Sequence, residues 1–152
     1  MEKLNKFFEL EEINGHNRCP TYLYRWTLFK CKLFKVYLHH FIADDWSLDF
    51  HDHPKRFISI GLKGSYWEDI PNPKKGYDKF IIRNCYSRYY VAPWIRTFPA
   101  NHIHRLRVPY KNTWTLVIVL KTEREWGFWH KGIWIHWKKY VDSIIADTEK
   151  SC

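Results

Sequence analysis

The sequence predicts a mainly β protein that folds as a sandwich or a barrel. Its 152 residues suffice for one domain with a sizeable core and are short for two, so residues 1–152 are expected to form a single domain. Hydrophobic residues make up 45% of the chain and aromatic residues 19%, which is enough apolar surface to fold. Short runs rich in Val, Ile, Tyr, Phe, Trp and Thr alternate with turn-forming or charged segments, as is typical of a sandwich or barrel.

Six of these runs are predicted to be strands. They cover residues 21–29, 33–42, 56–68, 79–84, 87–92 and 113–120. Together they place the barrel core at residues 21–120.

Helices are predicted at both ends of the barrel. The segment 1–15 contains an N-terminal helix over residues 2–12, where apolar residues stand among charges. The segment 124–150 begins with the aromatic run 124–137, a lid packed on the barrel or else a contact in a homo-oligomer. Apolar spacing then predicts a helix over residues 135–150.

The charge balance favours contact with anions. There are 25 Lys and Arg against 16 Asp and Glu, which gives a net charge of +9. The basic residues are spread along the chain without a long run of like charges, so a nucleic-acid-binding tail is not favoured. We expect a small anionic molecule as the ligand. A basic nucleic-acid-binding protein that uses Tyr and Trp faces is kept as an alternative.

Cysteine usage and the first residues favour the cytoplasm. Cys19, Cys31, Cys85 and Cys152 form no C-x-x-C pair and no zinc-finger spacing, so a reduced intracellular protein is the simpler interpretation. The opening "MEKLNKFFELEEINGHN" lacks the apolar core of a signal peptide. No apolar run approaches the ~20 residues needed to cross a bilayer, so no membrane contact is expected.

Two pairs of histidines are the strongest signal of chemistry. His51 and His53 lie two residues apart, and so do His102 and His104. Side chains two apart in a strand point to the same face, so each pair can direct both imidazoles into one cavity. Imidazole is a common ligand of transition metals, and histidines from two strands can leave other positions open for substrate. The alternative is that these side chains only fill the interior. We interpret "HH" at residues 39 and 40 as hydrogen-bonded core or surface residues.

The spacing around these histidines resembles the two motifs of the cupin superfamily. The first motif (G, five residues, H-x-H, three or four residues, E, six residues, G) would run Asp45, His51, His53, Phe57, Gly64. The second (G, five residues, P-x-G, two residues, H, three residues, N) would run Pro93, Pro99, Asn101, His104, Val108. The resemblance implies a double-stranded β-helix, or jelly-roll barrel, with short N- and C-terminal helices and a metal inside.

Departures from the pattern define the expected metal ligands. Phe57 stands where cupins often carry a metal-binding Glu, so the resemblance implies a three-histidine site of His51, His53 and His104. Such a site is similar to that of the thiol dioxygenases among cupins, which bind ferrous iron. We expect one divalent metal per chain, with Fe(II) first and Zn, Mn or Ni as alternatives. Three roles are left open for His102: a fourth ligand, a residue that hydrogen-bonds to the ligands, or a residue at the rim of the site.

Five short segments carry a narrower resemblance. "HDHP", "GSYWE", "HIHR", "TWTL" and "EWGFW" together resemble small cupin-like proteins of unassigned function from bacteriophages and large viruses. This resemblance implies a fold and a metal site but no reaction. A viral protein of this kind would act in the host cytoplasm.

Several polar side chains are candidates for binding a substrate. An arginine can hold a carboxylate or phosphate with two parallel hydrogen bonds, and hydroxyl groups can line the cavity wall. The candidates are Arg25, Ser59, Tyr66, Arg83, Arg96 and Arg105. For each arginine the alternative is a surface position. Asp52 points away from the cavity by strand parity and is expected to orient a loop.

The leading functional hypothesis is a non-haem Fe(II)-dependent dioxygenase that acts on a small polar or anionic metabolite. The first alternative is a noncatalytic small-molecule-binding module, which turnover of a defined ligand would separate from an enzyme. Metal-free acid–base catalysis by His102 or His104 would survive chelation, but it would not need the pair at His51 and His53. A steep loss of binding with salt would mark the nucleic-acid-binding alternative.

Overall fold

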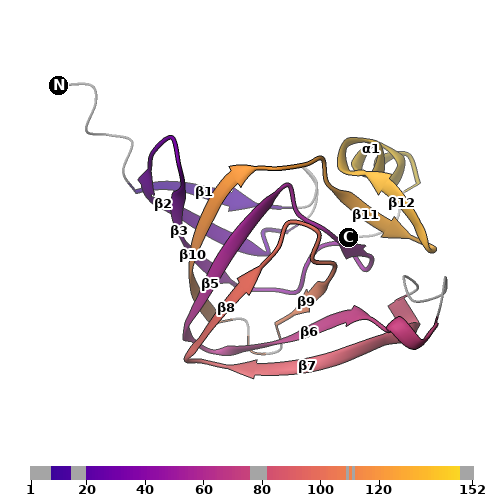
Figure 1. Cartoon of the computed structure of the whole chain (residues 1–152), viewed down its shortest axis with the longest axis horizontal. Coiled ribbons are helices and arrows are strands. Elements are labelled where there is room, and N and C mark those ends of the chain that lie inside the picture. The colour runs from indigo at the N-terminus through magenta and orange to yellow at the C-terminus, as the bar shows by residue number, and fades with distance from the viewer. Residues whose placement is uncertain (1–7, 15–19, 76–81, 109, 111, 148–152) are drawn as a thin grey trace.

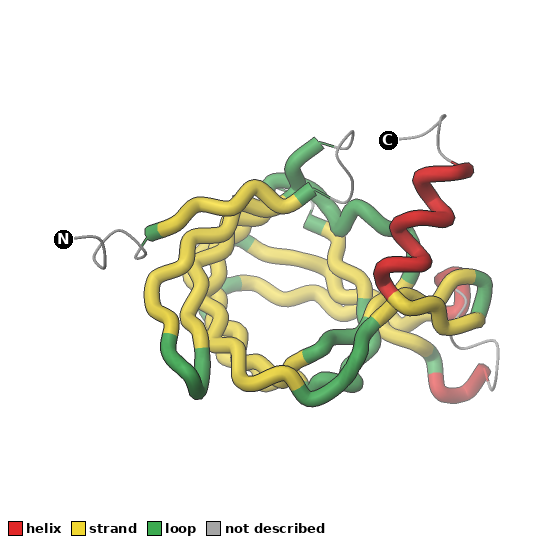
Figure 2. The backbone as a smooth tube through the Cα atoms, turned by 90° about the horizontal axis from the view of Figure 1, so that it is seen from above, coloured by secondary structure: helices red, strands yellow, loops and turns green. Residues whose placement is uncertain are grey.

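A sheet of six strands forms one wall of a barrel. The computed structural model describes residues 8–14, 20–75, 82–108, 110 and 112–147. In spatial order the strands of this sheet are β1 (Glu9–Ile13), β2 (Leu23–Lys30), β3 (Lys35–Phe41), β10 (Thr113–Thr122), β5 (Lys55–Lys63) and β8 (Trp94–Phe98). Every neighbouring pair is antiparallel. The sheet curves around the interior of the molecule (Figures 1 and 2).

Two smaller sheets face this wall. One contains β7 (Cys85–Val91), β6 (Ser65–Pro71) and β9 (Arg105–Arg107), and the other contains β12 (Ile133–His136), β11 (Gly127–His130) and β4 (Phe50–His51). The chain leaves the first sheet at Gly64, whose φ of +83° is rarely adopted by residues with a side chain. A Cβ atom there would also lie 2.6 Å from the Asn112 carbonyl oxygen. The predicted strand at 56–68 is therefore two strands in different sheets.

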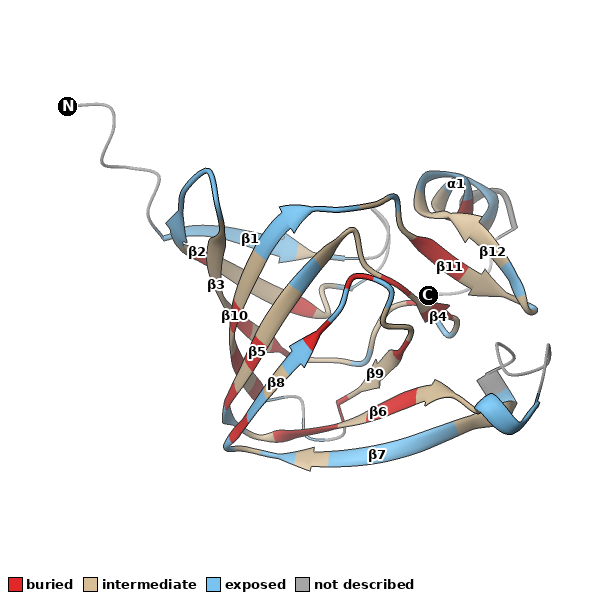
Figure 3. Cartoon of the chain, in the orientation of Figure 1, coloured by how far each residue is buried: buried red, intermediate tan, exposed pale blue. Residues whose placement is uncertain are grey.

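Burial differs from strand to strand and alternates most clearly along β10. On β10, Thr113, Thr115 and Val117 are buried and the residues between them are less so. β6 is largely buried, whereas its partner β7 is mostly exposed (Figure 3). A core cluster of Leu23, Phe41, Tyr66, Trp94 and Val108 joins the large sheet to the β6 sheet. The predicted mainly β class is confirmed.

The predicted C-terminal helix is confirmed as α1 (Trp137–Asp147), and residues 148–150 lie outside the described part. The phenol ring of Tyr140 stacks on Phe128 at 4.1 Å between centroids. Its hydroxyl group lies 2.7 Å from Ser47 Oγ and 2.7 Å from Asp49 Oδ2. Within the described residues, no helix is long and apolar enough to span a membrane.

The aromatic run at 124–137 contains the β11–β12 hairpin, which pairs through β11 with β4 of the barrel. Trp126 and Phe128 of this segment line the interior cavity. This agrees with the prediction of a segment packed on the barrel. An oligomer contact stays a prediction.

The predicted N-terminal helix is wrong where the chain is described. Glu9–Ile13 form β1, which is bonded along its length to β2, and residues 2–7 lie outside the described part. Glu11 also reaches Arg25, with 3.5 Å between its Oε2 and the arginine Nη1. These tertiary contacts override the helix preference of a short segment, which is marginal in isolation.

One predicted strand is wrong where it is described, and several observed strands were not predicted. Ile82–Asn84 form a 3₁₀ turn, so the strand predicted at 79–84 is wrong at its described end; residues 79–81 lie outside the description. The prediction also misses β8, because Pro93 and Pro99 flank it and suggest a turn. It misses β9, β11 and β12 because each is only three or four residues long.

Candidate metal centre and cavity

Backbone hydrogen bonds bring the two histidine motifs together. His51 N donates to the His104 carbonyl oxygen at 2.9 Å, and His104 N donates to the His51 carbonyl oxygen at 3.0 Å. This reciprocal pair forms an isolated antiparallel bridge. His53 N donates to the Ala100 carbonyl oxygen at 3.0 Å. Residues 51 and 104, far apart in sequence, are thereby fixed side by side.

The three predicted ligands converge on one point. Each of His51, His53 and His104 offers a ring nitrogen, and these atoms all lie within 4.8 Å of one another. The Nε2 atoms of His53 and His104 are 2.9 Å apart. Two nitrogens bound at right angles to a metal, each at about 2.1 Å, would lie about 3 Å apart. The residues present therefore fit a divalent transition metal, and all three donors are of the imidazole type that Fe and Zn accept.

Glu68, which our sequence analysis leaves without a role, orients one of these ligands. Its side chain is 1% exposed, and its Oε1 accepts hydrogen bonds from His104 Nδ1 and His102 Nε2, both at 2.8 Å. Because a carboxylate can only accept, the His104 proton sits on Nδ1 and the lone pair of Nε2 faces His53. A carboxylate behind a ligating histidine is the usual support of a metal site.

Arg96 neutralises the same carboxylate. Its Nη2 donates to Glu68 Oε2 at 2.5 Å and its Nη1 to the Tyr66 hydroxyl at 2.6 Å. Burial alone would raise the pKa of Glu68, but the hydrogen bonds from His102 and His104 and the nearby charges hold this pKa well below its usual range. Glu68, His102 and His104 form a second group with metal-ligand spacing. We interpret that group as the support of His104, because the charge of Glu68 is already balanced by Arg96.

Burial keeps the histidines of the centre neutral, which is the form that binds metal. It lowers the pKa of His104 to about 3, although the hydrogen bond to Glu68 opposes this. Burial, with the neighbouring His104, also sets the pKa of His53 well below its usual range. The pKa of His51 is lowered by burial and partly restored by the charge of Asp45, whose Oδ2 lies 3.8 Å from His51 Nδ1.

Asp52, between the two ligands of the first motif, fastens this loop to the β11–β12 hairpin. It is 1% exposed. Its Oδ1 accepts from Gly127 N at 2.8 Å, and its Oδ2 accepts from Trp134 Nε1 at 3.0 Å and lies 2.9 Å from Arg124 Nη1. This agrees with the expectation that Asp52 orients a loop and does not bind metal.

Replacing Asp52 with Ala should lower the free energy of unfolding by about 2–3 kcal/mol, because buried donors lose their acceptor. Urea denaturation of the metal-free protein measures this. Asp142, exposed on α1, is the matched control, and its replacement with Ala should cost less than about 0.5 kcal/mol. Equal effects of the two substitutions would contradict the role given to Asp52.

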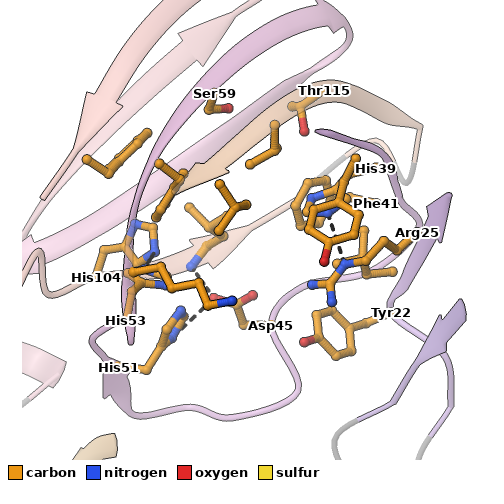
Figure 4. A pocket seen from close by; sticks show the side chains of 18 of the residues that line it. Tyr22, Arg25, His39, Phe41, Asp45, His51, His53, Ser59, His104 and Thr115 are labelled. Atoms are coloured by element: carbon orange, nitrogen blue, oxygen red, sulfur yellow. Dashed lines mark hydrogen bonds and ion pairs between the residues drawn. The ribbon is translucent and has the colours of Figure 1, made fainter. Parts of the chain in front are cut away.

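The three-histidine cluster opens into a cavity of about 410 Å³, within the range of small-molecule sites. Figure 4 shows His51, His53 and His104 on one side of it and Tyr22, Arg25 and His39 on the other. Of the candidate substrate-binding residues, Arg25, Ser59 and Tyr66 line the cavity. Phe57 also lines it and stacks edge-on against His53, with 4.9 Å between the ring centroids.

The other candidate arginines do not reach the cavity lining among the described residues. Arg83 is exposed, Arg96 is held by Glu68, and Arg105 is held by Asp69 at 2.6 Å. His102 is likewise outside the lining, since its ring is directed to Glu68. The ring of His102 is thus directed at the carboxylate that also bonds His104, and its role stays a prediction, as do the substrate contacts of the three arginines.

The sequence signals for the residues we missed are of unequal strength. Glu68 lies two residues after Tyr66 on one strand, so strand parity could have placed it on the inner face. His39 lines the cavity, while its neighbour His40 points outward and stacks on Trp114 at 4.1 Å. Strand parity requires such a split, but nothing in the sequence says which of the two faces in. Asp45, considered only as a motif position, also lines the cavity.

Comparison with known proteins supports the fold. By sequence, the chain matches no protein-family model and no curated protein. By structure, it is similar to a cupin-2 domain protein from Rhodospirillum rubrum, at a TM-score of 0.55 and 13% identity over 76% of this chain and 72% of that one. It is also similar to an RmlC-like cupin from Shewanella frigidimarina, at a TM-score of 0.51 and 15% identity over 76% of this chain and 86% of that one.

A metalloenzyme has the same fold. The Fe(II) enzyme HppE in complex with its substrate gives a TM-score of 0.55 and 8% identity, over 74% of this chain and 56% of that one. The structural neighbours are cupin superfamily proteins, and the fold of this chain is a cupin-type jelly roll. Identities this low establish the fold alone.

Proposed function

We propose that the barrel binds one divalent metal through His51, His53 and His104 and that this centre acts on a small polar or anionic molecule in the adjoining cavity. The observation that carries the proposal is the 2.9 Å separation of the His53 and His104 Nε2 atoms, with Glu68 fixing the tautomer of His104. In the metal-free protein His53 Nε2 can donate to the lone pair of His104 Nε2 at this distance, and a bound ion would replace that hydrogen bond with one coordinate bond to each nitrogen.

Iron is the first choice of metal and oxidation the first choice of reaction. A ferrous ion with three imidazole ligands and open positions supplies redox chemistry with dioxygen when it is bound. The Fe(II) enzyme among the structural neighbours supports iron in a barrel of this shape. The chain itself contributes neutral ligands, the Glu68 carboxylate that orients His104, and a cavity wall of aromatic side chains that includes Phe57. We therefore propose a non-haem Fe(II)-dependent dioxygenase, with Zn, Mn and Ni as the alternatives.

A noncatalytic binding module is the second candidate. The same cavity is lined largely by aromatic and aliphatic side chains, which suits capture of a small molecule without turnover. Consumption of a defined ligand by the iron-loaded protein separates the candidates. Origin in a bacteriophage or large virus, and action in the host cytoplasm, stay predictions from the motif resemblance.

Metal content tests the proposal. Protein purified without oxygen and reconstituted with Fe(II) should hold about one ion per chain by elemental mass spectrometry. The double variant His53→Ala, His104→Ala should hold almost none, because two of the ligands are removed. His40→Ala is the matched control, since His40 points away from the cavity, and should keep the wild-type content.

Thermal melts must show that the double variant is folded at the temperature of the assay. Equal metal content in the folded double variant and in His40→Ala would contradict the proposed centre. So would an iron-free wild-type protein that also takes up no zinc, manganese or nickel.

A further inference from the structure

Three polar residues form a row across the wall of the cavity that faces the metal centre. Arg25 on β2 is paired in register with His39 on β3, which is paired with Thr115 on β10. All three line the cavity. Figure 4 shows them across the cavity from His51, His53 and His104. The cavity therefore has a second polar region at the end remote from the candidate metal.

Arg25 is held in place by its neighbours. Its Nε donates to His39 Nε2 at 3.1 Å, and its guanidinium lies over the ring of Tyr37, 4.9 Å from the centroid. Because His39 accepts this bond, its own proton is on Nδ1 and the ring is neutral; burial also sets its pKa well below the usual range. The contact from Nη1 to Glu11 is long, 3.5 Å, and exposed, so it neutralises the guanidinium only weakly.

Thr115 lies next to His39 on the side away from Arg25 and supplies an unused hydrogen-bonding group. The residue is 2% exposed, and its Oγ1 has no hydrogen-bond partner within the described residues. Figure 4 shows this side chain directed into the cavity. A buried hydroxyl without a partner costs free energy, so it points to a ligand atom that completes it.

The charges along the cavity also favour an anion. Lys55 lines it as a second cation and has no ion-pair partner in the described part of the chain. The pKa of Lys55 is lowered chiefly by burial, and the charges of Lys35 and Arg25 add to this. Asp45 is the only carboxylate among the described lining residues, and its Oδ2 lies 3.8 Å from His51 Nδ1.

We infer that Arg25 and Thr115, with His39 orienting Arg25, bind a carboxylate at the end of the ligand that is remote from the metal centre. This inference adds a substrate class to the proposed function. It rests on the proposed function only for the reaction of the ligand at the metal centre. It narrows the ligand class to small molecules with a terminal carboxylate. An arginine offers such a group charge-assisted hydrogen bonds, and the Thr115 hydroxyl adds another.

The test uses simple carboxylates and metal-free protein, so that it does not depend on the metal centre. Acetate, succinate and glutarate, together with the neutral glutaramide, are titrated by calorimetry at low ionic strength. At least one carboxylate should bind, and glutaramide should bind at least about tenfold more weakly than glutarate. Arg25→Gln should weaken carboxylate binding about tenfold or more, and Thr115→Val, which keeps the shape of the side chain, about threefold to tenfold.

Arg56→Gln is the matched control, because Arg56 is exposed and pairs with Glu123 at the surface. It should leave carboxylate binding unchanged. The inference is overturned if none of the three carboxylates binds, or if Arg25→Gln and Arg56→Gln weaken binding equally. Metal uptake, measured on a portion of each preparation after reconstitution with Fe(II), distinguishes failure of this subsite from failure of the metal centre.

Discussion

Replacing Glu68 with Ala should destabilise the metal-free protein by about 3–5 kcal/mol, the cost expected when one partner of a buried ion pair is removed. The Arg96 side chain, 18% exposed, would lose its carboxylate, and the His102 and His104 donors would lose their acceptor. Urea denaturation monitored by tryptophan fluorescence measures the loss. Glu123→Ala is the control: this carboxylate is 41% exposed and pairs with Arg56, so its loss should cost less than about 1 kcal/mol.

A milder substitution separates stability from metal binding. Glu68→Gln keeps one acceptor oxygen but removes the charge that fixes the His104 tautomer. It should fold and bind metal about 10–100-fold more weakly, as is typical when the support of a ligating histidine is lost. Wild-type metal affinity in Glu68→Gln would show that Glu68 is only part of the core.

Stability of the metal-free protein should fall steeply as the pH drops below about 6.5. The pKa values of His39, His51, His53 and His104 are all lowered in the folded state, chiefly by burial, and that of His104 lies at about 3. Between the folded and unfolded pKa values the unfolded chain binds more protons, so acid favours unfolding. Stabilisation from these neutral histidines is therefore complete above pH 6.5 and lost below it.

The expected loss of stability at low pH is large because four histidines contribute to it. Each such histidine shifts the unfolding equilibrium by up to about tenfold per pH unit. Urea midpoints measured from pH 7.5 to 5.5 should fall throughout the lower half of this range, and bound Fe(II) or Zn(II) should delay the fall. Midpoints that stay constant to pH 5.5 would mean that these rings are protonated, or exposed, in the folded protein.

The sequence predicts the long strands of the barrel better than its first strand and its short strands. Runs rich in β-branched and aromatic residues between turn-forming segments carry their own signal, which is why β2, β3, β5, β7 and β10 are found close to the predicted positions. β1 is a strand only because β2 offers it a partner, and a single segment cannot show that. The short strands β9, β11 and β12 are too brief for any periodicity.

The candidate site divides in the same way. His51, His53 and His104 carry a spacing that can be identified before folding, and the structure brings their ring nitrogens together. Thr115 derives its role from neighbours on other strands, so no local pattern marks it. Strand parity with Tyr66 can place Glu68 on the inner face, but the partners that give Glu68 its role lie on other strands. Arg25 was one of four equivalent arginines in the sequence. Only the pairing of β2 with β3, and of β3 with β10, distinguishes it from Arg83, Arg96 and Arg105.

The most direct test of the central claim is the position of the metal. Crystals of protein loaded with Fe(II) without oxygen should show, in anomalous difference maps at the iron edge, one strong peak within about 2.0–2.3 Å of the ring nitrogens of His51, His53 and His104. A peak bound elsewhere, or no peak in protein that remains folded and was offered iron, zinc, manganese and nickel in turn, would contradict the three-histidine centre. The first result would direct a substrate search toward small carboxylates; the second would leave these histidines as part of the barrel core.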